Sequence, residues 1–267
     1  MTITTEMRIR GVGVLVCALL AIALVAPRAH AQSLAQGAAN YKPFAVEHIG
    51  IALAGAKELQ AAVKIGDIKA AQAAWIKSRK GWEAIEPITG EFFPKLDEAI
   101  DAWSDAKQGY HAVEAALFAG KLGEIGASVD GLVANLAEFD KQLSAPSFKL
   151  TPQGLLNGAT KLAYEVGENK SKGGESPYAG TSINDIFENN EGIEAVYKLV
   201  FHETLKKSDA KLAKRIVDKI EDVEGFVKGK DLKSLDAAGL TKAGEELAVL
   251  LQSAAPKLKL QKPKLGE

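Results

Sequence analysis

The residues whose types and spacing could bind a metal ion lie in two short motifs. His111 and Glu114 are three positions apart in the sequence GYHAVE, within a run rich in alanine and leucine. Glu83 and Glu86 have the same spacing and precede Pro87, which predicts the end of their helix. Positions three apart share one face of a helix, so each motif would present two polar groups on one side. Two such pairs on neighbouring helices can form a metal site inside a helical bundle.

Each pair has an ordinary alternative, because acidic pairs and single histidines are common on solvated helix faces. Carboxylates near a helix C-terminus are disfavoured by the helix dipole, and a cation bound near Glu83 and Glu86 would offset that effect. Histidine is also scarce, with four in the whole chain. Imidazole together with several carboxylates suits cations such as zinc, iron or manganese.

Further carboxylates could complete such a site. Asp97 and Asp101 are one helical turn apart, and they could supply a ligand or cap a helix. Asp185 begins an acidic series at three-residue steps in the second half of the chain. The sequence contains no His-Glu-x-x-His motif, no phosphate-binding glycine loop and no nucleophile elbow. A thermolysin-type protease therefore has no support.

Composition excludes several classes of function. The 267 residues include 33 basic and 34 acidic side chains, a net charge of −1, which gives no electrostatic case for nucleic-acid binding. Only residues 257–267 are locally basic, and we expect them to form a frayed tail. The one cysteine, Cys17, lies near the N-terminus. The rest of the chain must therefore fold around a hydrophobic core without disulfides or thiolate metal sites.

Residues 1–31 have the three regions of a secretory signal peptide. Arg8 and Arg10 precede an apolar run, and the small-x-small sequence AHA stands directly before Gln32. The apolar run is shorter than the roughly 20 residues that a membrane span needs. We therefore expect cleavage near Ala31–Gln32 and a periplasmic or secreted protein.

Almost every segment after Tyr41 has a helical pattern, because alanine, leucine, lysine and glutamate recur at three- and four-residue spacing. Signals for helix starts are given by Asp67, by Thr151 before Pro152, by Asp209 and by Asp236. Short connections between these helices predict an all-α fold of two packed up-and-down four-helix bundles. We expect the bundles to comprise residues 32–147 and 148–256.

The order of these motifs resembles the imelysin-like family, which includes periplasmic EfeO-type iron-uptake proteins. The resemblance is carried by WEAIEP at 82–87, by the family's Gly-x-His-x-x-Glu signature at 109–114, and by the stretch 174–192. It implies two four-helix bundles with a metal site in the cleft between them. Matched residue by residue, the metal ligands that the resemblance implies are Glu83, Glu86, Asp97, His111, Glu114 and Asp185. Asp101 is the alternative to Asp97.

The resemblance also implies a function, namely a periplasmic metal-binding protein of an iron-uptake system that serves a membrane permease or another uptake component. Iron is the expected ion, with zinc or copper as alternatives, and no catalytic residue is assigned. We expect the short form of these proteins, without the cupredoxin-like domain of full EfeO chains. Two other functions stay open: a metal-dependent hydrolase with Glu114 or Glu86 as general base, and a metal-free module that binds a ligand or a protein in the interbundle groove.

Overall fold

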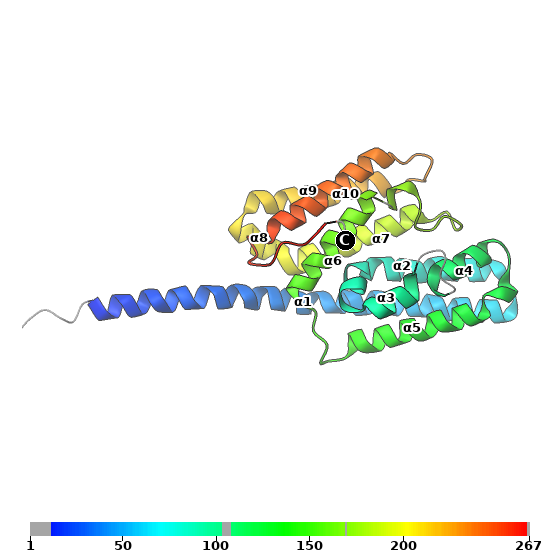
Figure 1. Cartoon of the computed structure of the whole chain (residues 1–267), viewed down its shortest axis with the longest axis horizontal. Helices are drawn as coiled ribbons and strands as arrows, with labels where there is room; N and C mark the ends of the chain where they lie inside the picture. The colour runs from blue at the N-terminus through cyan, green and yellow to red at the C-terminus, as the bar shows by residue number, and fades with distance from the viewer. Residues whose placement is uncertain (1–11, 103–107, 169, 266–267) are drawn as a thin grey trace, which may run out of the picture.

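The computed structural model describes residues 12–102, 108–168 and 170–265 of the chain. These residues form helices and no strands, which confirms the predicted all-α class (Figure 1). In chain order the α-helices are α1 (Val12–Ile65), α2 (Ile68–Phe92), α3 (Pro94–Asp101), α4 (Gly109–Phe118), α5 (Gly126–Ser144), α6 (Pro152–Glu168), α7 (Ser182–Val196), α8 (His202–Ser208), α9 (Ala210–Val227) and α10 (Ala237–Ala254). A π-helical turn, Tyr197–Phe201, joins α7 to α8, and 3-10 turns cover Leu122–Glu124 and Lys170–Lys172.

The helices gather in two halves (Figure 1). In the first half, α1 packs against α2 and α5, while α3 and α4 pack against both α2 and α5. In the second half, α6 packs against α10, and α9 contacts both α7 and α10. The halves meet largely through α2, which contacts α6 and α7. This is the arrangement of two packed helical bundles.

The longest helix, α1, starts within the segment expected to be a signal peptide and projects from the body of the molecule at that end (Figure 1). The expected cleavage site, Ala31–Gln32, lies inside this helix, and cleavage there stays a prediction. Among the described residues, none of the helices has both the length and the apolar character needed to cross a membrane.

The predicted helix starts follow from local capping. In each case the side-chain oxygen of the cap accepts a hydrogen bond from the backbone N–H three positions later, which satisfies one of the free donors of the first turn. The residues that do so are Asp67, Thr151, Asp209 and Asp236. These sequence signals are confirmed.

The predicted helix end at Pro87 is wrong, because α2 continues through this residue to Phe92. Proline has no N–H, so the carbonyl oxygen of Glu83 loses its partner within the helix. Nδ2 of Asn189, in α7, donates a hydrogen bond to that oxygen at 3.1 Å. Glu83 and Glu86 therefore lie inside the helix, and the expected dipole effect at a C-terminus does not apply to them.

Two glycines allow the second half to reach α2 close to these glutamates. A Cβ atom on Gly158 of α6 would lie 1.8 Å from the carbonyl oxygen of Pro87. A Cβ atom on Gly192 of α7 would lie 2.3 Å from the carbonyl oxygen of Ala84. Neither position has room for a side chain, so α6 and α7 pack backbone against backbone on α2.

The described part of the basic tail, residues 257–265, lies against the body of the protein. Leu258 is 1% exposed. The backbone N–H of Gln261 donates to Oε1 of Gln153 at 2.8 Å, and Nε2 of Gln252 donates to the carbonyl oxygen of Pro263 at 2.7 Å. The expectation of a frayed tail is therefore wrong for these residues, because apolar residues between the lysines pack and the backbone is hydrogen-bonded.

Candidate metal centre

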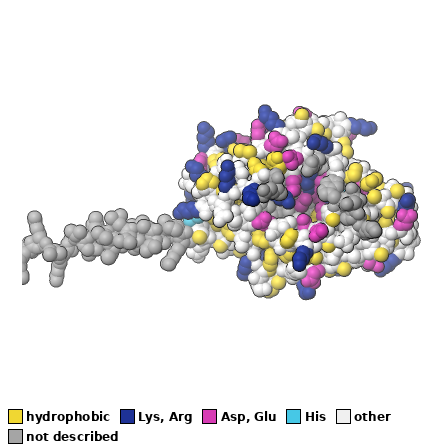
Figure 2. Space-filling model, viewed as in Figure 1, with side chains coloured by type: hydrophobic (Ala, Val, Ile, Leu, Met, Phe, Trp, Pro, Cys, Tyr) yellow, Lys and Arg dark blue, Asp and Glu magenta, His cyan; other side chains and the backbone are white. Residues whose placement is uncertain are grey.

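A cavity of about 390 Å³ is lined by residues from both halves of the molecule. Its charged lining includes Glu86 from α2, Asp101 from α3, His111 from α4, and Lys170 and Glu175 from the segment between α6 and α7. Figure 2 shows acidic side chains gathered in the hollow between the two halves. The predicted histidine and glutamate motifs therefore meet at one cavity.

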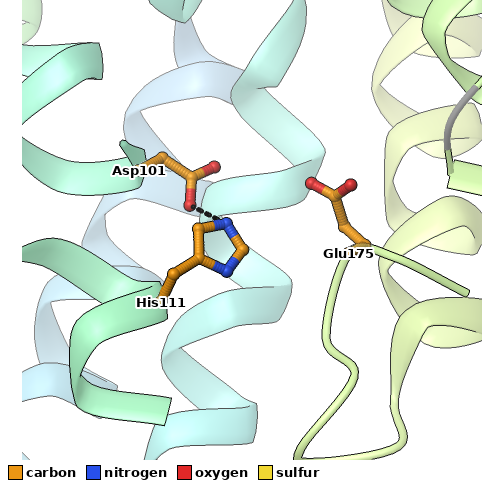
Figure 3. A group of neighbouring side chains, drawn as sticks. All are labelled: Asp101, His111 and Glu175. Carbon is orange, nitrogen blue, oxygen red and sulfur yellow. Dashed lines mark ion pairs between the residues drawn. The ribbon is translucent and has the colours of Figure 1, made fainter. Parts of the chain in front are cut away.

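Asp101, His111 and Glu175 form a first ligand group (Figure 3). Each can offer one ligand atom such that the three atoms lie within 4.8 Å of one another. Nε2 of His111 is 3.3 Å from Oδ1 of Asp101. Glu175 reaches toward this pair from the loop before α7 (Figure 3). One imidazole and two carboxylates are a donor set that suits iron, zinc or manganese.

Glu83, Glu86 and Glu175 form a second ligand group with the same spacing limit of 4.8 Å. This group surrounds the ammonium of Lys170, a side chain in the turn after α6. Nζ of Lys170 lies 2.9 and 2.7 Å from the two oxygens of Glu86 and 3.0 Å from Oε1 of Glu175. Oε2 of Glu83 is 3.6 Å away. The second group therefore already contains a cation that the chain itself supplies.

Arg79 borders both groups. Its buried guanidinium forms ion pairs with Asp101 and Glu83, and its Nη2 atom is 3.3 Å from Oε1 of Glu175. The other oxygen of Asp101 accepts a hydrogen bond from Nε1 of Trp82 at 2.8 Å. Groups that hold a ligand in place in this way fix its orientation and tune its affinity for a metal ion.

Two polar residues of α7, Asn189 and Asp185, also take part in hydrogen bonds at the site. Nδ2 of Asn189 donates to Oε2 of Glu83 at 2.7 Å and to Oε2 of Glu86 at 2.6 Å. Asp185 accepts a hydrogen bond from the hydroxyl of Ser176. Burial and the nearby charge of Glu83 raise the pKa of Asp185 to about 8.

Glu114 fastens the loop that carries Glu175. Its Oε1 atom accepts hydrogen bonds from the backbone N–H groups of Tyr178 and Ala179, both at 2.8 Å. Its Oε2 atom is 3.7 Å from Nδ1 of His111. Glu114 thus links the imidazole of α4 to the loop before α7, and it belongs to neither ligand group among the described residues.

Burial and charge shift the pKa values of the site groups in different directions. Burial raises the pKa of Glu86 to about 7, although Lys170 acts to lower it. Burial also acts to raise the pKa of Asp101, but Arg79, His111 and Lys170 together outweigh it and hold this pKa well below its usual range. Burial acts to lower the pKa of His111, but its interactions with Asp101 and Glu114 together outweigh that effect and raise the pKa to about 9.

The predicted ligands differ in whether they belong to one of the two ligand groups. The structure brings Glu83, Glu86 and His111 to the cavity region, in two groups that share Glu175. Asp97 lines the cavity but belongs to neither group among the described residues, and burial raises its pKa to about 6. Asp101, the alternative to Asp97, contacts His111.

Sequence reasoning missed four residues of the site as candidates: Arg79, Lys170, Glu175 and Asn189. Lys170 and Glu175 lie in a segment without helical periodicity, where spacing gives no information about which side chains meet. For Glu175, the one available signal was its place at the start of the stretch 174–192 that carries the family resemblance.

Comparison with known proteins assigns the chain to a family. The family model described as Imelysin matches residues 38–261. A Staphylococcus haemolyticus protein named "Efem/EfeO family lipoprotein" is 29% identical over 81% of this chain and 83% of its own length. "Iron uptake system component EfeO" of Escherichia coli O1:K1 is 30% identical over 82% of this chain, which spans 64% of that protein. "Iron uptake system component EfeM" of Pseudomonas syringae pv. syringae is 28% identical over 78% of this chain and 76% of its own length. The chain belongs to the imelysin family.

Proposed function

We propose that this protein is an iron-binding component of an iron-uptake system and that it holds one ion in the cavity between its two halves. The observation that carries the proposal is the grouping of Asp101, His111 and Glu175, whose ligand atoms lie within 4.8 Å of one another. The names of the relatives support iron as the cargo.

The charge balance of the site favours a metal cation. The carboxylates of the two groups face two buried cations, Arg79 and Lys170. These carboxylates are Glu83, Glu86, Asp101 and Glu175. When all are ionised, one negative charge stays in excess even with His111 protonated, and charges interact more strongly in the protein interior than in water. A divalent or trivalent ion would relieve this repulsion.

The residues around the ion would have separate tasks. Asp101, His111 and Glu175 would supply the ligand atoms. Arg79 would hold the carboxylates of Asp101 and Glu175 in place. Glu114 would hold the loop that brings Glu175 to the site. Iron is the cargo of this site in our proposal, and zinc or copper are the competing ions.

The proposal includes a location and a partner. After cleavage near Ala31–Gln32 the protein would be periplasmic or secreted and would deliver iron to a membrane permease or another uptake component. Mass spectrometry of the protein recovered from its natural compartment would test the cleavage. A chain that starts at Gln32 is expected, and an intact segment 1–31 would contradict this part.

Calorimetric titration tests the metal assignment. Ferrous iron under anaerobic conditions, ferric iron, zinc and copper would each be titrated into the wild type and into His111→Ala. We expect binding of iron by the wild type and a loss of at least about tenfold in affinity in the variant, because a ligand is removed. His202→Ala, outside the cavity, is the control and should bind like the wild type. Equal binding by both histidine variants, or no binding by the wild type, would refute the assignment.

A further inference from the structure

Glu175 is shared by the two ligand groups of the cavity. A carboxylate common to two ligand sets is a familiar feature of centres that bind two metal ions, which lie about 3.5–4 Å apart in hydrolytic enzymes. In this chain, however, the two positions differ. The guanidinium of Arg79 contacts both positions, through Asp101 on one side and Glu83 on the other. The position beside Glu83 and Glu86 has in addition the ammonium of Lys170, which lies among all three carboxylates of that group.

The surroundings of Lys170 are those of a bound cation. The residue is 4% exposed, and its Nζ atom is in contact with three carboxylates at 2.7–3.6 Å. Three carboxylates around one amino group form an ion-pair cluster, and the ammonium of Lys170 neutralises part of the charge of the second group.

A second feature also indicates that this group is built for a cation. Asn189 is fully buried and donates its Nδ2 hydrogens to Glu83 and Glu86. Its Oδ1 atom is buried without a hydrogen-bond partner among the described residues. Buried polar atoms are normally paired. The Nδ2 group thus holds two of the three carboxylates in place around the ammonium of Lys170.

We infer that Lys170 is a built-in cation that fills the Glu83–Glu86–Glu175 group and thereby restricts the cavity to a single metal ion. The part of this inference that concerns the remaining ion rests on the proposed function. Lys170 occupies the place of a second metal ion, so the centre holds cargo in one position and a tethered ammonium in the other. The lysine also keeps Glu175 in place, through Oε1, when no metal ion is bound.

Equilibrium dialysis against Mn²⁺ with elemental analysis tests this inference through stoichiometry, because Mn²⁺ accepts carboxylate and imidazole ligands. The wild type should bind one ion per chain. Lys170→Met removes the ammonium and should bind two. Lys172→Met is the matched control, since Lys172 lies in the same turn with an exposed side chain, and it should bind one.

The substitution of Lys170 leaves carboxylates without their cation, so its effect on folding must be measured as well. Thermal unfolding with and without Mn²⁺ should show a destabilised Lys170→Met that the ion stabilises more than it stabilises the wild type. The double variant Lys170→Met with Glu86→Gln removes one charge of each sign, and it should fold and bind one ion. A single variant that stays unfolded at every Mn²⁺ concentration would overturn the inference, because a metal ion then cannot replace the lysine.

The outcomes separate this inference from the proposed function. One ion in both the wild type and Lys170→Met would overturn the inference and leave the proposed function standing. Two ions in the wild type, or two in the double variant, would also overturn the inference. No ion in the wild type and one in Lys170→Met would refute the proposed function and support the inference.

Discussion

The two ligand groups that share Glu175 differ in the source of the positive charge that compensates their carboxylates. Both bring carboxylates together in a buried place, where ionised groups need a compensating charge. On the side of Glu83 and Glu86 the chain supplies an ammonium from Lys170. On the side of Asp101 and His111 the chain supplies the imidazole of His111 and the guanidinium of Arg79. In our proposal the Asp101–His111 side holds the cargo ion, whereas the Glu83–Glu86 side holds the ammonium of Lys170.

The two groups also differ in the helices that position them. Glu83 and Glu86 lie within the 25-residue helix α2, against the backbones of α6 and α7. Asp101 is the last residue of α3, and His111 lies in the first turn of α4. Helix ends are less constrained than a packed helix interior. Lys170 is thus bound mainly by carboxylates from the interior of one packed helix, and the proposed cargo by residues at the ends of two helices.

The largest effect is expected from the residue that borders both groups. Arg79→Met would leave Asp101 and Glu83 without their guanidinium partner. Removal of one member of a buried ion pair typically destabilises a protein by roughly 3–5 kcal/mol, and we expect a loss of this size in urea unfolding. Lys77→Met is the control, because its pair with Glu58 is exposed and should contribute less than about 1 kcal/mol. Equal losses in the two variants would contradict the role of Arg79.

The next largest effect is expected on metal affinity, from Glu175, the residue shared by the two ligand groups. Glu175→Gln should weaken metal binding by more than about a hundredfold, since even groups that only hold a ligand change affinity by 10–100-fold. Glu165→Gln is a control that lines the same cavity outside both groups of described residues. Titration with the metal ion found for the wild type provides the measurement. Similar affinities in the two glutamine variants would show that Glu175 is not a ligand.

Two adjacent asparagines of α7 have different partners, so their variants distinguish a role in metal binding from a role in stability alone. Nδ2 of Asn189 contacts Glu83 and Glu86, whereas Nδ2 of Asn190 donates to the carbonyl oxygen of Ile220 at 3.1 Å. Each change to alanine leaves buried groups unpaired and should reduce the free energy of unfolding by about 1–3 kcal/mol.

Metal binding distinguishes the two variants. Asn189→Ala should alter the affinity for the metal ion, because it frees the carboxylates beside Lys170 and Glu175. Asn190→Ala should leave that affinity unchanged despite its lower stability. If both variants change the affinity equally, the asparagine contacts to the carboxylates carry no specific role.

The smallest of these effects is expected at Glu114. Glu114→Ala removes the acceptor of the backbone N–H groups of Tyr178 and Ala179, so hydrogen exchange at these two amides should become faster. Glu114→Gln keeps an acceptor oxygen and should preserve their protection. We expect the alanine variant to lose about tenfold in metal affinity through the loosened loop. Unchanged exchange in Glu114→Ala would contradict the loop-holding role.

Much of the fold could be predicted because its signals are local. Caps such as Asp67 and Asp209 act on backbone groups three residues away, and helical periodicity is visible within one segment. The continuation of α2 through Pro87 could not be predicted in this way. The hydrogen bond that replaces the missing one comes from Asn189, 106 positions after Glu83.

Prediction of the candidate site was limited in the same way, because its residues meet through contacts between distant parts of the sequence. The spacing of His111 and Glu83 with their partners predicts shared helix faces, but no spacing rule reaches Lys170 or Glu175 in the segment between α6 and α7. Between Asp97 and Asp101 the periodicity gives no preference, since the two lie one turn apart on the same helix. The choice is made by contacts with Arg79 and Trp82, which only the packed structure provides.

In our proposal the metal ion binds at Asp101, His111 and Glu175 while Lys170 keeps its place in the other group. Crystals of the wild type prepared with iron or manganese, measured at the absorption edge of that metal, show where the ion binds. We expect one anomalous peak per chain, bounded by the imidazole of His111 and the two carboxylates. A peak among Glu83, Glu86 and Glu175 with Lys170 displaced, or no peak in the cavity, would contradict it.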